Sequence, residues 1–340
     1  MDDISARHRL VIERTLRWRH YAWYWGDAIA VDGLLAAPVS LAPMARDSVI
    51  EQLEHWAATA PDNFDDVLAP GLAIMSLARS GALQSRAVDR FVASVDRLPT
   101  LPCGLPALEP QRPAFRFGFC IDALYHLPPA MAALGVWRHE PARVRAAAEM
   151  ALRGIDVLAC PTGWAQWYDD TVERNNAIAW SRGIGWALLG TLDLLAELDD
   201  SDPAGRQHVA ELEDHAARML DRLAATQAAS GNWAAVLDDE LAPQETSTAA
   251  FFVAGARHAR LTGVWTAPTE VLAKAEDAVM ASIAVDGLVT GVSADILPAW
   301  EINGYRAFGC EPSPWAQGAG LRALAVMDRA PLAAGDSADA

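Results

Sequence analysis

IAWSRGIGWALLGTLDLL, residues 178–195, has the spacing of a helix and almost no charge on any face. A helix that is apolar all round must be buried on most sides, which places it in an inner layer covered by other helices. Residues 248–256 lack charge in the same way. Two such segments predict a fold in which an outer layer of helices surrounds an inner one.

Helical patterning continues along the whole chain, and few segments alternate with the period of two that strands show. Helices are expected at residues 5–19, 22–37, 46–59, 66–80, 85–96, 119–135, 140–159, 178–198, 205–228, 246–262, 268–283 and 314–328. Twelve helices in two concentric layers make an all-α (α/α)6 barrel. We expect one domain over residues 1–330 and a disordered tail, rich in Ala, Asp, Gly and Ser, over residues 331–340.

In such a barrel the loops at one end form the cleft. The candidate loops are long and mix polar with aromatic residues: 61–65, 97–118, 160–177, 229–245 and 284–313. The Pro-rich segment 98–116 is expected to be an ordered, non-helical flap.

Composition limits the function. The chain of 340 residues carries a net charge of −17 and has no basic run, which argues against a nucleic-acid partner. No apolar run is long enough to span a membrane, and no leader pattern opens the chain, so we expect a soluble, cytoplasmic protein. The four cysteines are widely spaced and predict reduced thiols rather than a zinc site. The thirteen tryptophans suit an aromatic-lined cleft, although core packing also uses Trp.

The motif Trp180-Ser-Arg-Gly-Ile-Gly-Trp186 combines two indoles and a guanidinium at the expected start of a helix. Arg182 and Trp186 are four residues apart and would share one helix face. An indole can stack on a ring, and a guanidinium together with the bare N–H groups of a helix start can hold a carboxylate. The motif therefore predicts a site for a ring-shaped, negatively charged ligand such as a sugar acid.

Asp122 is a single acid in the apolar segment Phe119-Cys-Ile-Asp-Ala-Leu-Tyr-His126, which follows Arg116. It has two interpretations. It could cap a helix, or it could be a desolvated carboxyl whose raised pKa allows it to donate and accept a proton near neutrality. His126, one turn later, is more often a packed core residue than a base.

The segment Asp62-Asn-Phe-Asp-Asp66 could likewise cap a helix, or supply the second carboxylate that glycoside chemistry uses. The loop 163–170, with Trp167, could contact a ligand or fasten itself to the barrel rim. The Thr/Ser cluster in Gln244-Glu-Thr-Ser-Thr248 is expected to cap the helix that follows. Arg116, Trp167 and Trp233 are further candidate substrate contacts.

Taken in order, these segments resemble the unsaturated glucuronyl and rhamnogalacturonyl hydrolases, glycoside hydrolase families 88 and 105. The ordered set comprises Trp23-Tyr-Trp-Gly-Asp, Gly33-Leu-Leu, the Asn/Asp segment ending in Pro70-Gly71, Asp122-x-Leu-Tyr and the 180–186 motif. Gly231-x-Trp before an acid pair and Glu245-Thr-Ser-Thr-Ala complete it. Together the motifs cover most of residues 18–325.

The resemblance implies an (α/α)6 barrel acting on a small oligosaccharide with a 4,5-unsaturated uronic acid at its non-reducing end. Asp122 would protonate C4 and activate the water that adds at C5. Asp66, or else Asp65, would be the second carboxylate and orient the ring hydroxyls. Trp180, Arg182 and Trp186 would bind the ring and its carboxylate. Neither a metal nor an organic cofactor is implied.

The chain departs from the family pattern at two places. Gln166-Trp-Tyr-Asp-Asp stands where rhamnogalacturonyl members usually place a His, and Cys120-Ile121 replaces a frequent Trp before Asp122. Two alternatives follow: a barrel that binds sugar acids without turnover, or another (α/α)6 sugar enzyme such as an epimerase or an inverting glycosidase. An epimerase would require paired cleft histidines, and several of the eight His look like solvated helix-face residues.

Overall fold

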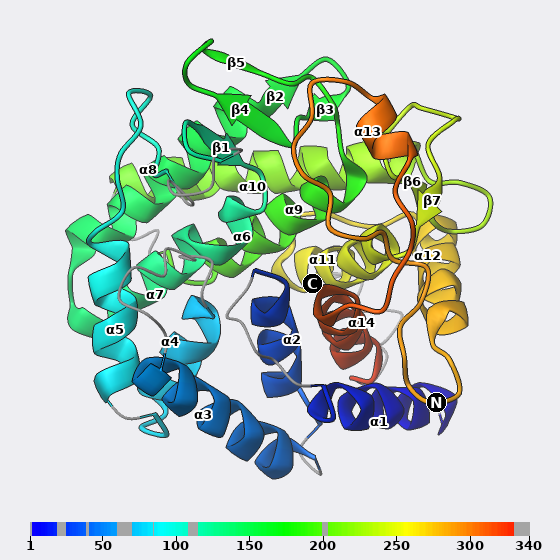
Figure 1. The fold of residues 1–340 in the computed structure, drawn as a ribbon, viewed down its shortest axis with the longest axis horizontal. Helices are drawn as coiled ribbons and strands as arrows, with labels where there is room; N and C mark the ends of the chain where they lie inside the picture. Colours follow the sequence, from blue (N-terminus) through cyan, green and yellow to red (C-terminus); the bar gives the residue numbers. More distant parts are fainter. Residues whose placement is uncertain are drawn as a thin grey trace, which may run out of the picture.

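The inner layer of the barrel is a closed ring of helices. The computed structural model describes residues 2–18, 25–38, 41–59, 70–83, 85–107, 115–198 and 203–329 (Figure 1). The ring consists of α2 (Trp25–Leu35), α4 (Gly71–Arg79), α7 (Pro128–Arg138), α9 (Ser181–Leu195), α11 (Ser247–Thr262) and α14 (Pro314–Met327). Each helix contacts the next one in this order, and α14 closes the ring against α2.

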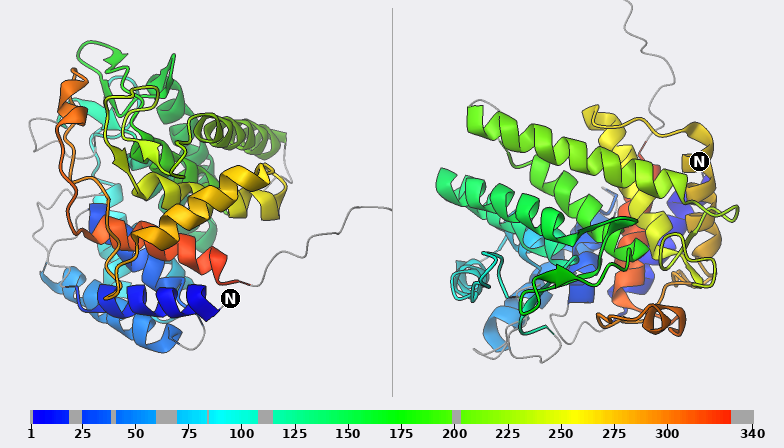
Figure 2. Two further views of the ribbon diagram at one scale, coloured as in Figure 1. Left: turned by 90° about the vertical axis from the view of Figure 1, so that its right-hand side faces the viewer. Right: turned by 90° about the horizontal axis from the view of Figure 1, so that it is seen from above.

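The outer layer covers this ring from outside. It consists of α1 (Asp2–Leu16), α3 (Ala42–Thr59), α5 (Ser85–Val95), α8 (Pro141–Leu158), α10 (Pro203–Ala225) and α12 (Thr269–Ser282). Its helices expose their charged faces, and α8 and α10 lie side by side on the surface (Figure 2). Residues 181–192 of α9 are buried without interruption, as the apolar sequence predicted. The prediction of an all-α (α/α)6 barrel is confirmed.

Glycine allows the inner helices to approach one another closely. A Cβ at Gly190 of α9 would collide with the backbone carbonyl of Leu124, and one at Gly185 would lie 2.6 Å from Cβ of Phe251 on α11. Gly185 of the 180–186 motif and Gly190 therefore serve close packing inside the barrel.

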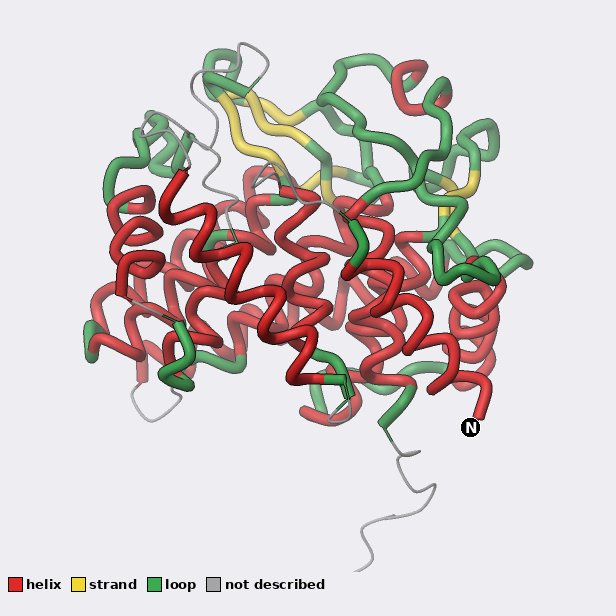
Figure 3. The backbone as a smooth tube through the Cα atoms, turned by 60° about the horizontal axis from the view of Figure 1, so that its bottom comes forward, coloured by secondary structure: helices red, strands yellow, loops and turns green. Residues whose placement is uncertain are grey.

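The short strands and the longest loops gather at one end of the barrel, while shorter loops join the helices at the other end (Figure 3). The strands are β1 (Gly118–Cys120), β2 (Ala159–Cys160), β3 (Gly163–Trp164), β4 (Trp167–Asp169), β5 (Arg174–Asn175), β6 (Trp233–Ala234) and β7 (Gln244–Glu245). They pair antiparallel in the orders β1-β4-β5, β2-β3 and β6-β7. This end also carries α13 (Asn303–Arg306).

The expected helix over residues 119–135 is wrong at its start. Residues 118–120 pair with β4 as a strand, and a single turn, α6 (Ala123–His126), precedes α7. Pro128 and Pro129 begin α7, where the missing N–H groups cost nothing, so the chain breaks there into two helices. Most other expected helices match the structure to within a few residues over their described parts, although α9 begins three residues later than expected.

Three predictions concern residues outside the described part of the chain: the 61–65 loop, the first turn of the helix expected from residue 66, and the tail 331–340. The single-domain boundary at residue 330 stays a prediction. None of the described helices is both long enough and apolar enough to cross a bilayer.

Candidate active site

A pocket opens where the first turns of the inner helices meet the loops of the strand-bearing end. Its described lining consists of Trp25, Phe115, Gly118, Cys120, Asp122, Gln166, Trp167, Trp180, Asp295 and Ile296. The lining is largely aromatic and contains two carboxylates. No arginine, lysine or histidine is among these lining residues.

Asp122 lies in this pocket with 8% of its surface exposed. Strand β1 carries the chain to the barrel mouth, and Asp122 follows in helical conformation, directly before α6. Its side chain makes no capping hydrogen bond to α6. Instead, Oδ2 accepts a hydrogen bond from the thiol of Cys120 at 3.0 Å. The capping interpretation is therefore wrong, and the carboxyl is positioned in a desolvated, aromatic pocket.

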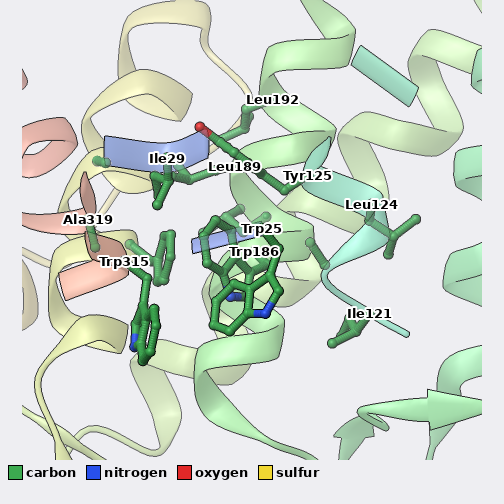
Figure 4. Packing of buried hydrophobic residues seen from close by; sticks show 14 of the residues in the cluster. Trp25, Ile29, Ile121, Leu124, Tyr125, Trp186, Leu189, Leu192, Trp315 and Ala319 are labelled. Carbon is green, nitrogen blue, oxygen red and sulfur yellow. The ribbon is translucent and has the colours of Figure 1, made fainter. Parts of the chain in front are cut away.

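Trp180 and Trp186, the two indoles of the 180–186 motif, are both almost completely buried, but only one of them reaches the pocket. Trp180 precedes α9, is 1% exposed and lines the pocket. Trp186 is fully buried below it, with its ring centroid 5.9 Å from that of Trp25 and 4.7 Å from that of Phe251 (Figure 4). The structure does not bring Trp186 to the pocket surface. Trp186 instead packs against Trp25, which does line the pocket.

Arg182 is also fully buried, and its guanidinium donates hydrogen bonds to other residues of the protein. Nη1 donates to the backbone carbonyl and the hydroxyl of Ser293 at 2.6 and 2.7 Å, and Nη2 donates to the carbonyl of Ala294 at 2.9 Å. The guanidinium carbon lies 4.6 Å from the ring centroid of Trp180. The expected contact with a ligand carboxylate is thus replaced by contacts to residues 293–299, which we call the strap.

The strap is also fastened by Gln166, which lies between β3 and β4, and by Asn176, which directly follows β5. Gln166 Nε2 donates to the carbonyl of Ile296 at 2.9 Å, and Asn176 Nδ2 donates to the carbonyl of Ala299 at 2.8 Å. The hydroxyl of Tyr305 donates to Gln166 Oε1 and accepts from Asn176 Nδ2. Gln166 therefore holds the strap and lines the pocket at once.

Replacing Arg182 by Lys is expected to lower the free energy of unfolding by about 2 kcal/mol, because one ammonium group cannot reproduce the planar fork that bridges Ser293 and Ala294. Chemical denaturation measures the change. Arg174→Lys is the matched control, since Arg174 is exposed and its guanidinium lies over the ring of Trp300. Equal stability of the two variants would contradict the anchoring role.

Of the other expected substrate contacts, one lines the pocket and two do not. Trp167 lines the pocket and packs edge-on against Phe115, with ring centroids 5.5 Å apart. Arg116 is exposed and outside the lining, with its guanidinium over the ring of Phe117. Trp233 is fully buried, and its Nε1 donates to a backbone carbonyl of α10, so the structure places it in the core. Asp65 and Asp66 lie outside the described residues.

Two further motifs have structural roles. Glu245, rather than a hydroxyl, caps α11, because its carboxylate accepts the backbone N–H groups of Ser247 and Thr248. In the 163–170 loop, Asp170 accepts the backbone N–H of Cys103 at 3.1 Å, which ties the loop to the preceding flap. For Asp170, the interpretation that the loop fastens itself in place, rather than contacting a ligand, is supported.

Two buried titratable groups near the pocket, His126 and Tyr305, are neutral. Burial lowers the pKa of His126 to about 3, so it is uncharged at neutral pH. Burial is also the main cause that raises the pKa of Tyr305. Among the described residues, no three His, Cys, Asp or Glu side chains are arranged to hold a metal ion.

Sequence comparison identifies the family. The model of Glycosyl Hydrolase Family 88 matches residues 119–330, more than half of the chain and the part that carries Asp122 and the strap. No curated protein sequence matches the chain significantly.

Solved structures share the fold. A possible member of the GH105 family from Salmonella enterica has a TM-score of 0.82 and 17% sequence identity over 96% of this chain and 93% of that one. The unsaturated glucuronyl hydrolase of Bacillus sp. GL1 has a TM-score of 0.70 and 14% identity over 96% of this chain and 95% of that one. At such low identity the likeness concerns the fold alone. From the family match and the barrel together, the chain belongs to glycosyl hydrolase family 88 and is a glycoside hydrolase.

Proposed function

We propose that this enzyme removes a 4,5-unsaturated uronic acid from the non-reducing end of small oligosaccharides. The observation that carries the proposal is Asp122, a desolvated carboxyl in an aromatic pocket at the loop end of a family 88 barrel. The similar protein from Bacillus sp. GL1 is an unsaturated glucuronyl hydrolase responsible for glycosaminoglycan degradation. Another similar structure is that of a variant with dGlcA-Glc-Rha-Glc.

The proposed reaction is hydration of the vinyl ether in the unsaturated ring. Asp122 gives its proton to C4, and the positive charge that develops at C5 is shared with the ring oxygen. Water adds at C5 and returns a proton to the Asp122 carboxylate. The hemiketal formed at C5 then opens, and the remaining sugar leaves. Asp122 ends the cycle protonated, as it began, and no bond to the enzyme forms.

Ring binding is assigned to the pocket aromatics. Trp167 offers indole surface to the flat, unsaturated ring, and Trp180, which is 1% exposed, forms part of the same lining. The second carboxylate is proposed at Asp66, or else at Asp65, to orient the ring hydroxyls. Arg182 contributes through the strap, since its guanidinium is bonded to Ser293 and Ala294.

The test is a panel of unsaturated disaccharides, each paired with its saturated counterpart. Turnover is expected to abolish the ultraviolet absorbance of the conjugated double bond, while the saturated partners, which lack the vinyl ether, remain intact. In deuterium oxide the product is expected to carry deuterium at C4. Cleavage of the saturated compounds would point to attack at the anomeric carbon and would contradict the proposal.

A barrel that binds without turnover is the second candidate, because Gln166 occupies the family histidine position and is bonded to the strap. Calorimetric titration with the same disaccharides distinguishes the two candidates. Binding of the unsaturated compounds with no product from any of them would favour the binding protein.

A further inference from the structure

Cys120 is built into the pocket beside the proposed acid. It is the last residue of β1, its backbone pairs with Trp167 of β4, and its side chain is 8% exposed and lines the pocket. The chain then turns, held by a hydrogen bond from Ile121 N to the carbonyl of Gln166 at 2.9 Å. This turn directs Asp122 back toward the strand, so that Oδ2 of Asp122 and Sγ of Cys120 are 3.0 Å apart.

The contact has a defined chemical direction. An ionised carboxylate only accepts hydrogen bonds, whereas a thiol is a weak donor. Donation to the carboxylate stabilises its charged form, while burial favours the neutral form. A buried general acid needs both influences in balance, because its proton must be available near neutral pH.

We propose that Cys120 is a positioning residue for Asp122: its thiol holds Oδ2, fixes the rotamer of the carboxyl in the pocket and makes the carboxyl easier to ionise. The expected effect on the pH profile rests on the proposed function. The positioning of Asp122 does not, because the hydrogen bond from Cys120 exists whether or not substrate is turned over.

The other titratable groups near Asp122 would not produce the same change in its ionisation. Tyr305, on α13, is coupled electrostatically to Asp122 and Cys120, but its raised pKa keeps it neutral over the working range. His126, one turn along α6, is neutral as well. Asp295, on the strap, is the other carboxylate among the described lining residues. Asp65 and Asp66 lie outside the described residues, so the experiment changes the thiol and leaves every carboxyl in place.

Cys120→Ala is expected to move the basic limb of the kcat/KM profile to higher pH by about half a unit. Loss of the donor raises the pKa of Asp122, and a weak donor accounts for less than the 1.36 kcal/mol that one full unit represents. Cys120→Ser retains a hydroxyl donor and is expected to restore the wild-type limb. Cys160→Ala, which removes a thiol outside the pocket lining, is the matched control and leaves the profile unchanged.

A spectroscopic measurement separates this inference from the proposed function. The infrared S–H band that disappears in Cys120→Ala belongs to Cys120. At a pH above the basic limb of the profile, where Asp122 is ionised, we expect Asp122→Asn to move this band to higher frequency, because an amide oxygen is a weaker acceptor than a carboxylate. An unmoved band would overturn the inference even if the enzyme is active. An unchanged pH profile in Cys120→Ala, or a Cys120→Ser profile shifted like that of Cys120→Ala, would also overturn it. If no disaccharide is turned over but the band shifts, the proposed function fails and the positioning contact stands.

Discussion

Replacement of Asp122 by Asn is expected to lower kcat at least about a thousandfold. General acid and base catalysis contributes about two to four orders of magnitude, and the proposed mechanism uses Asp122 in both roles. Asn is nearly the same size and retains an oxygen that can accept from the Cys120 thiol, so the pocket should keep its shape. KM should change little. The loss of absorbance of an unsaturated disaccharide measures the rate.

Asp295→Asn is the matched control, because it removes a carboxylate from the same pocket lining without removing the proposed acid. We expect it to retain far more activity than Asp122→Asn. Thermal unfolding of both variants should agree with wild type, which excludes loss of the fold as the cause. An Asp122→Asn protein with wild-type turnover would remove Asp122 from the mechanism.

Replacement of Asp32 by Asn is expected to stabilise the protein by about 3 kcal/mol at pH 8 and to have little effect near pH 4. Asp32 lies on α2, two turns beyond the pocket end of the helix, beside a cavity of about 400 Å³. Its Oδ2 accepts the hydroxyl of Tyr125 at 2.8 Å. Burial raises the pKa of Asp32 to about 7, although Arg322 and Tyr125 act in the opposite direction.

The direction in which the free energy of unfolding changes with pH follows from proton binding. Between about pH 4 and pH 7 the folded protein keeps a proton on Asp32 that the unfolded chain has lost, so the free energy of unfolding falls as pH rises through this window. A shift of about three units corresponds to about 4 kcal/mol at most. Asn cannot ionise and still accepts the Tyr125 hydroxyl, so the variant avoids this loss.

Chemical denaturation at pH 4 and pH 8 measures the difference. Tyr125→Phe is the companion variant with the opposite sign: it removes a donor to the carboxylate and should weaken the fold more at pH 8 than at pH 4. Equal effects of Asp32→Asn at both pH values would show that Asp32 has an ordinary pKa in the folded protein.

The fold was predictable because burial leaves a pattern in the sequence. Helices such as 178–195 and 248–256 have no charged face, and only an inner ring can hold them. The error at residues 119–135 has a local cause. Phe119 and Cys120 suit either a helix or a strand, and the pairing with β4 that decides between them is a tertiary contact.

The site was predictable in part. Asp122, Trp167 and Trp180 line the pocket, and each is a chemically distinctive residue next to a helix start or loop, which makes it recognisable in the sequence. Depth was not predictable: Trp186 and Trp233 have the residue type of a ligand contact but point into the core. Sequence spacing gives the face of a helix and does not show what covers that face.

The strap lies in the 284–313 loop, which the sequence predicts at the cleft, but the individual residues that reach the pocket were not predictable. Asp295 and Ile296 lie in a long segment without periodicity, and they reach the pocket because distant side chains hold the backbone there. The role of Arg182 was not predictable for the same reason: it depends on strap carbonyls more than a hundred residues away in sequence. Cys120 and Gln166 were noticed only as departures from the family pattern.

The indoles around the pocket have an optical consequence. Trp25, Trp167 and Trp180 line the cavity, and Trp186 contacts Trp25 from below. Tryptophan fluorescence responds to the polarity of its surroundings, so a sugar that displaces water from this cavity should shift the emission of the unlabelled protein. The inactive Asp122→Asn variant would hold its ligand unchanged during such a titration, and the intrinsic emission would then report affinity directly, without a chromophore on the sugar.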